Sequence, residues 1–197
     1  MPPLPPITQA LLLANVGVFC AQFLLGGWIE GLFALWPLGA GFLPWQVVSY
    51  AFLHGSLGHL FFNMLGVWMF GAELERLWGS QRFVQFYAAS VLAAAATQLV
   101  FTSLSGSLVP TVGASGGLFG LLLAYGMLFP NRTIMPLFPP IPMKARTFVA
   151  IFGGLELLLG VTGTQSGIAH FAHLGGMLGG YLMIRYWRGQ APFGRRR

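Results

Sequence analysis

The sequence predicts an all-α, polytopic membrane protein with six transmembrane helices, on the basis of its composition, the length of its apolar segments and the placement of its charges. Of its 197 residues, 56% are hydrophobic and only 7% are charged, and the mean hydropathy is +0.74. A soluble domain carries about 25% charged residues, so lipid is the expected solvent for much of this surface. We expect one membrane domain over residues 1–197, with a Pro-rich lead-in at 1–6 and a basic cytoplasmic tail at 189–197.

Six apolar segments approach the length of about 20 residues that a helix needs to cross a bilayer. The predicted spans are 7–26, 56–75, 82–104, 115–130, 146–164 and 167–187. Between the first two lies segment 27–55, which is too apolar for a free loop and is interrupted by Pro37 and Pro44. We expect this segment to lie partly in the membrane interface, against the helical bundle.

The basic residues predict how the spans are oriented. The first, third and fifth connections contain no Lys or Arg, and the 10 basic residues are Arg76, Arg82, Arg132, Lys144, Arg146, Arg185, Arg188 and 195–197. Because Lys and Arg concentrate on the cytoplasmic side, both termini are expected there, in a multi-pass protein of the bacterial inner (plasma) membrane. The net charge of +6 does not indicate a nucleic-acid partner, since these charges sit at helix ends rather than along one face.

Reactive polar side chains gather at one predicted depth of the membrane. With the amino terminus inside, the second, fourth and sixth spans all begin on the outer side. Near those beginnings lie His59 and Asn63 in the second span, Ser115 in the fourth, and His170 and His173 in the sixth. Ionisable and polar residues within spans are costly and usually functional, so we expect a site in the outer half of the bilayer.

Ser115 follows Gly113 and Ala114 and precedes Gly116 and Gly117. One interpretation is a helix N-cap, a position that serine favours. The glycines favour a more specific one, because they let another helix approach the backbone beside the hydroxyl. The string also fits the G-x-S-x-G elbow of soluble α/β-hydrolases, but that motif needs a preceding strand, and here a loop leads into a membrane helix.

The sixth span supplies a candidate base for this serine. Gly176 and Gly180 form a small-xxx-small face that allows close packing against the glycines of the fourth span. Such a crossing would bring His173 toward Ser115, where its imidazole could accept the hydroxyl proton. His170 lies one turn earlier on a neighbouring face, and either histidine could instead make only a helix–helix hydrogen bond.

His59 and Asn63 are spaced i and i+4, so they share one face of the second span. Pointing into the bundle, they could donate hydrogen bonds to a developing oxyanion, together with the backbone N–H of Ser115. The alternative is a structural polar contact within the bundle.

The sequence contains no aspartate, which excludes a Ser-His-Asp triad. Glu156 lies inside the fifth span, either as a buried, protonated hydrogen-bond donor or as a functional acid. We interpret the site as a Ser115–His173 dyad. Phe119, one turn after Ser115 on the same face, could stack on the imidazole and orient it in place of a carboxylate.

These motifs resemble those of the rhomboid family of intramembrane serine proteases. Ser115 in its glycine context resembles the nucleophile, with Gly113 and Gly116 as supporting positions. The stretch from Ala172 to Gly176 resembles the histidine motif. Aligning its glycines selects His173 as the base and leaves His170 as a supporting neighbour.

The second predicted span and the residues after it carry the remaining likeness. His54 to Asn63 resembles the motif that ends in the oxyanion His and Asn, and Glu75 and Gly79 also fit the family pattern. The first loop has Trp45-Gln46 where some members have Trp-Arg, and Phe119 stands where some carry tyrosine.

The resemblance implies a six-helix core that cleaves transmembrane protein substrates near the outer membrane face, without a cofactor. It implies substrates with small residues at the cleavage site and helix-destabilising residues after it. It also implies entry between the second and fifth spans, with the first loop and the segment before the fifth span as mobile elements.

Three other classes of function remain as alternatives. A catalytically inactive relative would bind or transport membrane spans without cutting them. A metal site would use the imidazoles of His54, His59, His170 and His173, although there is no H-E-x-x-H motif. A cysteine hydrolase would need Cys20, the only cysteine, which lies in the first span away from every histidine.

Overall fold

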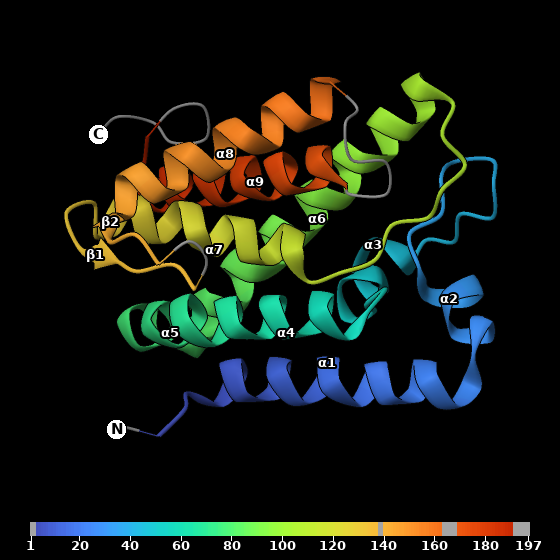
Figure 1. The fold of residues 1–197 in the computed structure, drawn as a ribbon, viewed down its shortest axis with the longest axis horizontal. Helices are drawn as coiled ribbons and strands as arrows, with labels where there is room; N and C mark the ends of the chain where they lie inside the picture. The colour runs from blue at the N-terminus through green and yellow to red at the C-terminus, as the bar shows by residue number, and fades with distance from the viewer. Residues whose placement is uncertain (1–2, 138–139, 163–168, 191–197) are drawn as a thin grey trace.

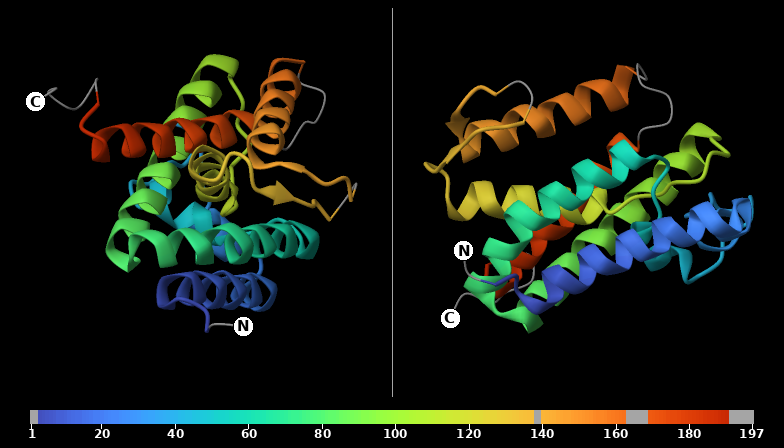
Figure 2. Two further views of the ribbon diagram at one scale, coloured as in Figure 1. Left: turned by 90° about the vertical axis from the view of Figure 1, so that its left-hand side faces the viewer. Right: turned by 60° about the horizontal axis from the view of Figure 1, so that its bottom comes forward.

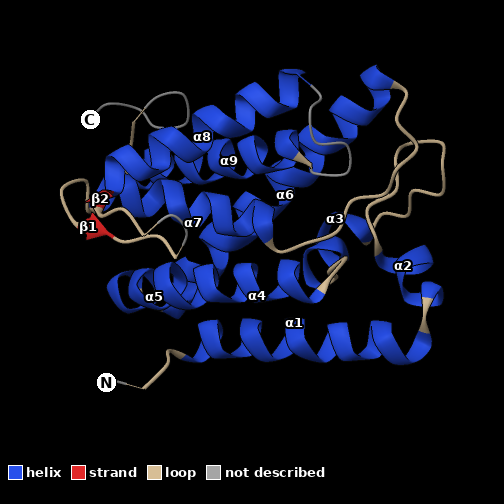
Figure 3. Cartoon of the chain, in the orientation of Figure 1, coloured by secondary structure: helices blue, strands red, loops and turns tan. Residues whose placement is uncertain are grey.

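A computed structural model describes residues 3–137, 140–162 and 169–190. It confirms the all-α membrane bundle (Figure 1), and the cartoon of secondary structure shows helices nearly throughout (Figure 3). The helices are α1 (Pro6–Leu25), α2 (Gly27–Phe33), α3 (Gln46–Ser49), α4 (Leu57–Gly66), α5 (Ala72–Trp78), α6 (Ser80–Ser105), α7 (Ser115–Leu128), α8 (Ala145–Thr162) and α9 (His170–Trp187), with η1 (Tyr50–Phe52) and the π-helical turn η2 (Val67–Gly71). A short antiparallel hairpin pairs β1 (Thr133–Ile134) with β2 (Met143–Lys144).

The helix boundaries lie close to the predicted spans. Helices α1, α6 and α8 are long and apolar enough to cross a membrane by themselves. The second predicted span corresponds to α4, η2 and α5, which follow one another without a break and end at Trp78 rather than at residue 75. Residues 163–164 and 167–168 of the fifth and sixth predicted spans lie outside the described residues.

Helix α7 lies at the centre of the bundle, as the end-on view shows (Figure 2). Most of its residues are buried. It is only 14 residues long, which is possible because other helices rather than lipid surround it.

Glycines bring the backbones of α6, α7 and α9 together. A Cβ atom on Gly116 or Gly117 would lie 2.5 Å from a side-chain carbon of α6, and one on Gly176 of α9 would overlap the carbonyl of Gly116. A Cβ on Gly180 would lie 3.3 Å from Gly120. The glycine spacing in the sequence therefore corresponds to a close crossing of α7 and α9.

The basic residues of the described chain belong to segments at one end of the bundle, where α1 and α6 begin, the hairpin lies and α9 ends (Figure 1). Arg76 donates a hydrogen bond to the carbonyl of Pro3 at 3.0 Å. Arg82 lies over the ring of Trp187 near the end of α9. The predicted cytoplasmic face corresponds to this end, and residues 195–197 lie outside the described residues.

Segment 27–55 packs partly against the bundle and partly outside it. Leu35 and Thr111 exchange two backbone hydrogen bonds of 2.9 Å, which tie the segment to the loop before α7. Gln46 is fully buried, and its side-chain oxygen accepts the N–H groups of Trp36 and Leu43. Gln46 therefore stabilises the turn of this loop from inside, whereas the neighbouring Trp45 is half exposed.

Helix α1 is attached mainly at its two ends. At its start, the carboxylate of Glu75 accepts hydrogen bonds from the backbone N–H groups of Ile7 and Thr8, at 3.0 and 2.7 Å, and from the hydroxyl of Ser80 at 2.7 Å. At its end, Gln22 accepts the N–H of His54 at 2.9 Å. Glu75 thus joins the first turn of α1, whose N–H groups have no partner within the helix, to the Ser80 hydroxyl at the start of α6.

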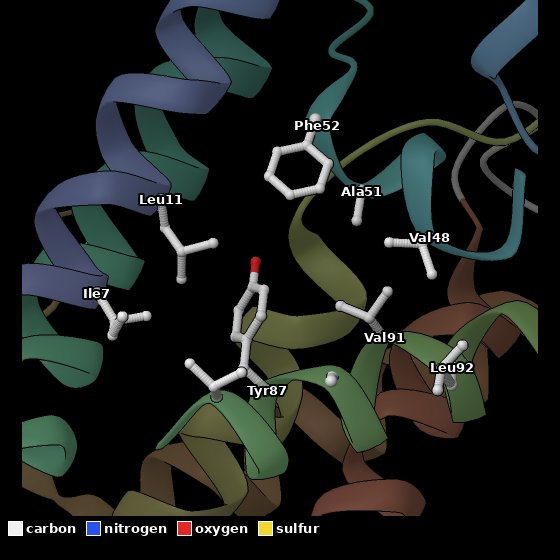
Figure 4. Close-up of a pocket in the computed structure, with 10 residues that line it drawn as sticks. Ile7, Leu11, Val48, Ala51, Phe52, Tyr87, Val91 and Leu92 are labelled. Carbon is white, nitrogen blue, oxygen red and sulfur yellow. The ribbon is translucent and has the colours of Figure 1, made fainter. Parts of the chain in front are cut away.

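Between these two attachments, an apolar pocket of about 210 Å³ separates α1 from α6 (Figure 4). Leu11 of α1 faces it from one side and Phe52 from another, while the ring of Tyr87 rises from α6 toward them. The looser contact of α1 contrasts with the glycine-mediated contact of α6, α7 and α9.

Candidate active site

The side chains of Ser115 and His173 meet. The Ser115 Oγ lies 2.7 Å from the Nε2 of His173. Ser115 is the first helical residue of α7, whose N-cap is Ala114, so the serine does not act as the N-cap that one interpretation predicted. Its hydroxyl is instead free to bond the imidazole.

Phe119 lies face to face with the imidazole of His173. The two ring centroids are 4.3 Å apart and the rings are within 6° of parallel. A stacked ring restricts rotation of the imidazole about its side-chain bonds, so this contact holds the Nε2 toward Ser115.

A positive-φ glycine shapes the opposite side of the serine. Gly113 has φ of +127°, and a Cβ atom there would lie 2.7 Å from the Nε2 of His59 and 3.5 Å from the Oγ of Ser115. Only glycine fits both restraints. The N–H of Ser115, in the first turn of α7, has no partner within the helix. Donors from α4 and α7 therefore converge beside the hydroxyl.

Asn63 is buried on the same face of α4, and its Nδ2 lies 3.0 Å from the Nε2 of His54. Burial, assisted by the neighbouring ring of His59, lowers the pKa of His54 to about 4. His54 is therefore neutral at pH 7, and its Nε2 can accept one amide hydrogen of Asn63. The second amide hydrogen stays available to a bound group.

Glu156 is the residue whose role the sequence left open. Its Oε2 lies 2.6 Å from the Nδ1 of His170 and 2.9 Å from the Nδ1 of His173. A Cβ atom on Gly153 or Gly160 would touch α9 at 3.2 and 3.1 Å. The spacing of Gly153, Glu156 and Gly160 puts all three on one face of α8, and this small-residue pattern indicates that the face packs against another helix without indicating which residues Glu156 meets.

These groups line one large cavity of about 1290 Å³. Its walls come from α4 and η2 on one side, through Phe62 and Met69, and from α8 on the other, through Phe152. His59, Asn63, Ser115, Phe119, Glu156, His170 and His173 all face it. The cavity exceeds the usual size of a small-molecule pocket, about 300–1,000 Å³. It lies between the second and fifth spans, where the resemblance implies that substrate enters.

Four of the supporting residues, Gly113, Gly116, His54 and Glu75, do not line this cavity. His54 contacts two residues that line it, Asn63 and His59, and Glu75 lies where α1 and α6 begin. Cys20 is exposed on α1 and is not part of the lining either.

Among the described residues, the four histidines His54, His59, His170 and His173 do not form one metal site. Glu156, His170 and His173 offer ligand atoms within 4.8 Å of one another, whereas His54 pairs with Asn63. These three side chains are the types that zinc binds, so a metal remains a testable alternative use of the cluster.

The sequence matches the Rhomboid domain over residues 42–189. The chain belongs to the rhomboid family. It is thus an integral membrane protein of that family, as the motifs around Ser115 and His173 predicted.

Several curated rhomboids are similar to this chain. It is 30% identical over 183 residues to the rhomboid protease GlpG of Klebsiella pneumoniae, 33% over 140 residues to the rhomboid protease GluP of Bacillus subtilis, and 32% over 140 residues to the mitochondrial rhomboid protein 1 of Saccharomyces cerevisiae. The alignments cover 90%, 70% and 70% of this chain and 62%, 25% and 40% of those rhomboids. The chain thus spans less than two thirds of each relative's length.

Proposed function

We propose that this rhomboid is an intramembrane serine endopeptidase that cleaves transmembrane segments of other membrane proteins with a Ser115–His173 dyad. The observation that carries the proposal is the 2.7 Å contact between Oγ and Nε2 inside a cavity large enough for an extended peptide. A serine is a weak nucleophile unless an adjacent base accepts its proton, and this contact supplies the base.

In the first half of the reaction, the Oγ of Ser115 attacks the scissile carbonyl carbon while the Nε2 of His173 accepts the hydroxyl proton. The tetrahedral oxyanion forms beside the N–H of Ser115 and the side chains of His59 and Asn63, which are the proposed donors. His173 then gives its proton to the departing amine as the C–N bond breaks. The product is an acyl-enzyme on Ser115.

In the second half, water attacks the acyl carbon, and His173 accepts a proton from that water and returns one to the Ser115 oxygen. Helices α4, α7 and α9 all begin at the end opposite the basic residues. If that end is the outer one, the site is within reach of external water. We therefore place both termini in the cytoplasm and the cleavage near the outer face of a bacterial inner membrane.

The substrate segment enters between α4 and α8, unwinds, and presents an extended backbone to Ser115. As the resemblance to the family implies, we expect small residues at the cleavage site. Helix-destabilising residues after that point would lower the free energy needed to unwind the segment.

The experiment uses the purified chain in bilayer vesicles with a fluorescent transmembrane substrate. Wild type should release product, whereas Ser115→Ala and His173→Ala should each reduce kcat by about 10⁴-fold or more, since the nucleophile and the base act as a unit. Both variants should keep the wild-type melting temperature. Binding of the substrate without cleavage by wild type would instead indicate an inactive, span-binding rhomboid.

A further inference from the structure

The contacts of Glu156 carry an inference beyond a two-residue dyad. One oxygen of its carboxylate, Oε2, lies within 2.9 Å of the Nδ1 atoms of two imidazoles, those of His170 and His173. The approach to His170 has both the distance and the direction of a hydrogen bond. The approach to His173 has the distance of a hydrogen bond but not its direction. Poorly aligned contacts of this kind are common in catalytic sites before substrate binds.

The contact of His173 with Ser115 determines which ring nitrogen of His173 carries the hydrogen. When the hydroxyl donates to Nε2, that nitrogen carries no proton, and the neutral imidazole must hold its hydrogen on Nδ1. A hydrogen on Nδ1 needs an acceptor, and no other side chain of the described residues makes a hydrogen bond to it. The Oε2 of Glu156 is the acceptor within reach.

The surroundings make this carboxylate effective. The side chains of Glu156, His170 and His173 are only 13%, 5% and 11% exposed. A charge in such a place interacts strongly with its neighbours because little water screens it. The two N–H groups offered by the imidazoles also offset part of the cost of keeping a carboxylate in the membrane.

We propose that Glu156 is a positioning residue for His173, which makes the site a Ser115–His173–Glu156 relay assembled from three helices, α7, α9 and α8. The carboxylate holds the imidazole in its Nδ1–H form and stabilises the imidazolium that forms when His173 accepts the Ser115 proton; it does not take the proton itself. His170 holds the carboxylate in place through a contact with the same oxygen, Oε2. This inference rests on the proposed peptidase function.

The first test compares Glu156→Gln with wild type in the vesicle cleavage assay. Glutamine keeps the size of the side chain and removes its charge. We expect kcat to fall by about 10²-fold with KM nearly unchanged, a smaller loss than the roughly 10⁴ known for a lone orienting carboxylate, because Phe119 also holds the ring. Glu30→Gln, which removes a carboxylate on α2, is the matched control and should keep wild-type kcat.

A second pair of variants separates positioning from mere folding. His170→Ala leaves Glu156 with His173 as its partner and should stay within about tenfold of wild-type kcat. Glu156→Asp keeps the charge and should recover part of the activity that Glu156→Gln loses. If His170→Ala loses as much activity as Glu156→Gln, the carboxylate acts only through His170 and the proposal is wrong.

A spectrum of wild type tests the position of the His173 hydrogen directly. In the ¹⁵N spectrum of the histidine-labelled chain in micelles, His173, assigned by its loss in His173→Asn, should carry its hydrogen on Nδ1, with a strongly downfield proton resonance. A hydrogen on Nε2 would overturn the proposal. So would loss of cleavage on adding a chelator, which would assign Glu156 to a metal instead.

These results also separate the two proposals. If wild type cleaves and Glu156→Gln cleaves within threefold of it, the relay is wrong and the dyad stands. If wild type neither cleaves nor reacts at Ser115, the peptidase function is wrong, whatever the histidine spectrum shows.

Discussion

Helices α7 and α8 face each other across the active-site cavity, and they are held in very different ways. Along α7, glycines let its backbone contact side chains of α6 and the backbone of α9, and most of its residues are buried. Along the described part of α8, the buried side chains are Ala145, Phe148 and Val149, all at its start. The proposed nucleophile and base therefore lie on the tightly packed side, and the cavity wall opposite them is loosely packed.

This difference matches two requirements of a protease that works on membrane spans. Ser115 and His173 must stay within a fraction of an ångström of their reactive geometry, which close packing provides. A transmembrane substrate must also pass into the cavity, so one wall has to move, and a helix with few buried contacts moves at low cost. Glu156 is the described side chain of α8 that reaches across to His170 and His173.

The largest effect should come from the tightly packed side. Gly176→Ala places a methyl group inside the carbonyl of Gly116. Because backbone cannot rotate away as a side chain can, we expect a stability loss of about 1–3 kcal/mol or more. The displaced His173 should also lower kcat by about 10²-fold. Melting temperature in micelles and the cleavage assay measure both, and wild-type values would show that α7 and α9 are not in close contact.

Gly113→Ala should damage catalysis more than stability. The alanine would be strained at φ of +127° and its methyl would push His59 away from the serine. Loss of one oxyanion donor costs about 10²–10³ in kcat. Gly39→Ala is the control, because Gly39 also has positive φ, +83°, but its Cβ would meet nothing within 4 Å. Equal kcat losses in both variants would argue against a special position for His59.

A smaller effect is expected for Phe119. Phe119→Tyr keeps the ring that stacks on His173 and should retain nearly full activity. Phe119→Leu removes the ring and should lower kcat about threefold to tenfold, the rate equivalent of about 0.5–1.5 kcal/mol. Titration of initial rates against substrate concentration separates kcat from KM. A change confined to KM would assign Phe119 to substrate binding instead.

The smallest effect should come from α8. A Cβ atom on Gly154 would meet nothing within 4 Å, so Gly154→Ala should raise stability by up to about 1 kcal/mol through helix propensity. The same glycine-to-alanine change should thus raise stability in α8 and lower it at Gly176 in α9. A melting temperature below wild type for Gly154→Ala would mean that α8 is packed more tightly than the contrast with α7 requires.

The sequence predicted the parts of the structure that depend on one helix at a time. Apolar length located the spans to within a few residues, and the spacing of Gly176 and Gly180 indicated the face of α9 that meets α7. Ser115 and His173 came together because both lie in the first turn of helices that start at the same end of the bundle. The contact itself follows from a crossing that the glycines permit.

Features that depend on how two helices are rotated and tilted against each other were not predictable in this way. Glu156 meets His170 and His173 only because α8 turns the face of Gly153 and Gly160 toward α9. Similarly, nothing local to Glu75 indicated that its carboxylate would accept the first N–H groups of α1. Such contacts join residues far apart in the chain, and single-sequence periodicity carries no information on their relative register.

The most direct test of the whole account is the reactivity of Ser115 toward a fluorophosphonate probe in the vesicle-reconstituted chain. We expect wild type to be labelled, with the adduct mapped to Ser115 by mass spectrometry, and both Ser115→Ala and His173→Ala to be unlabelled. Folded wild type that stays unlabelled, or an adduct on any other residue, would contradict an activated serine at this site.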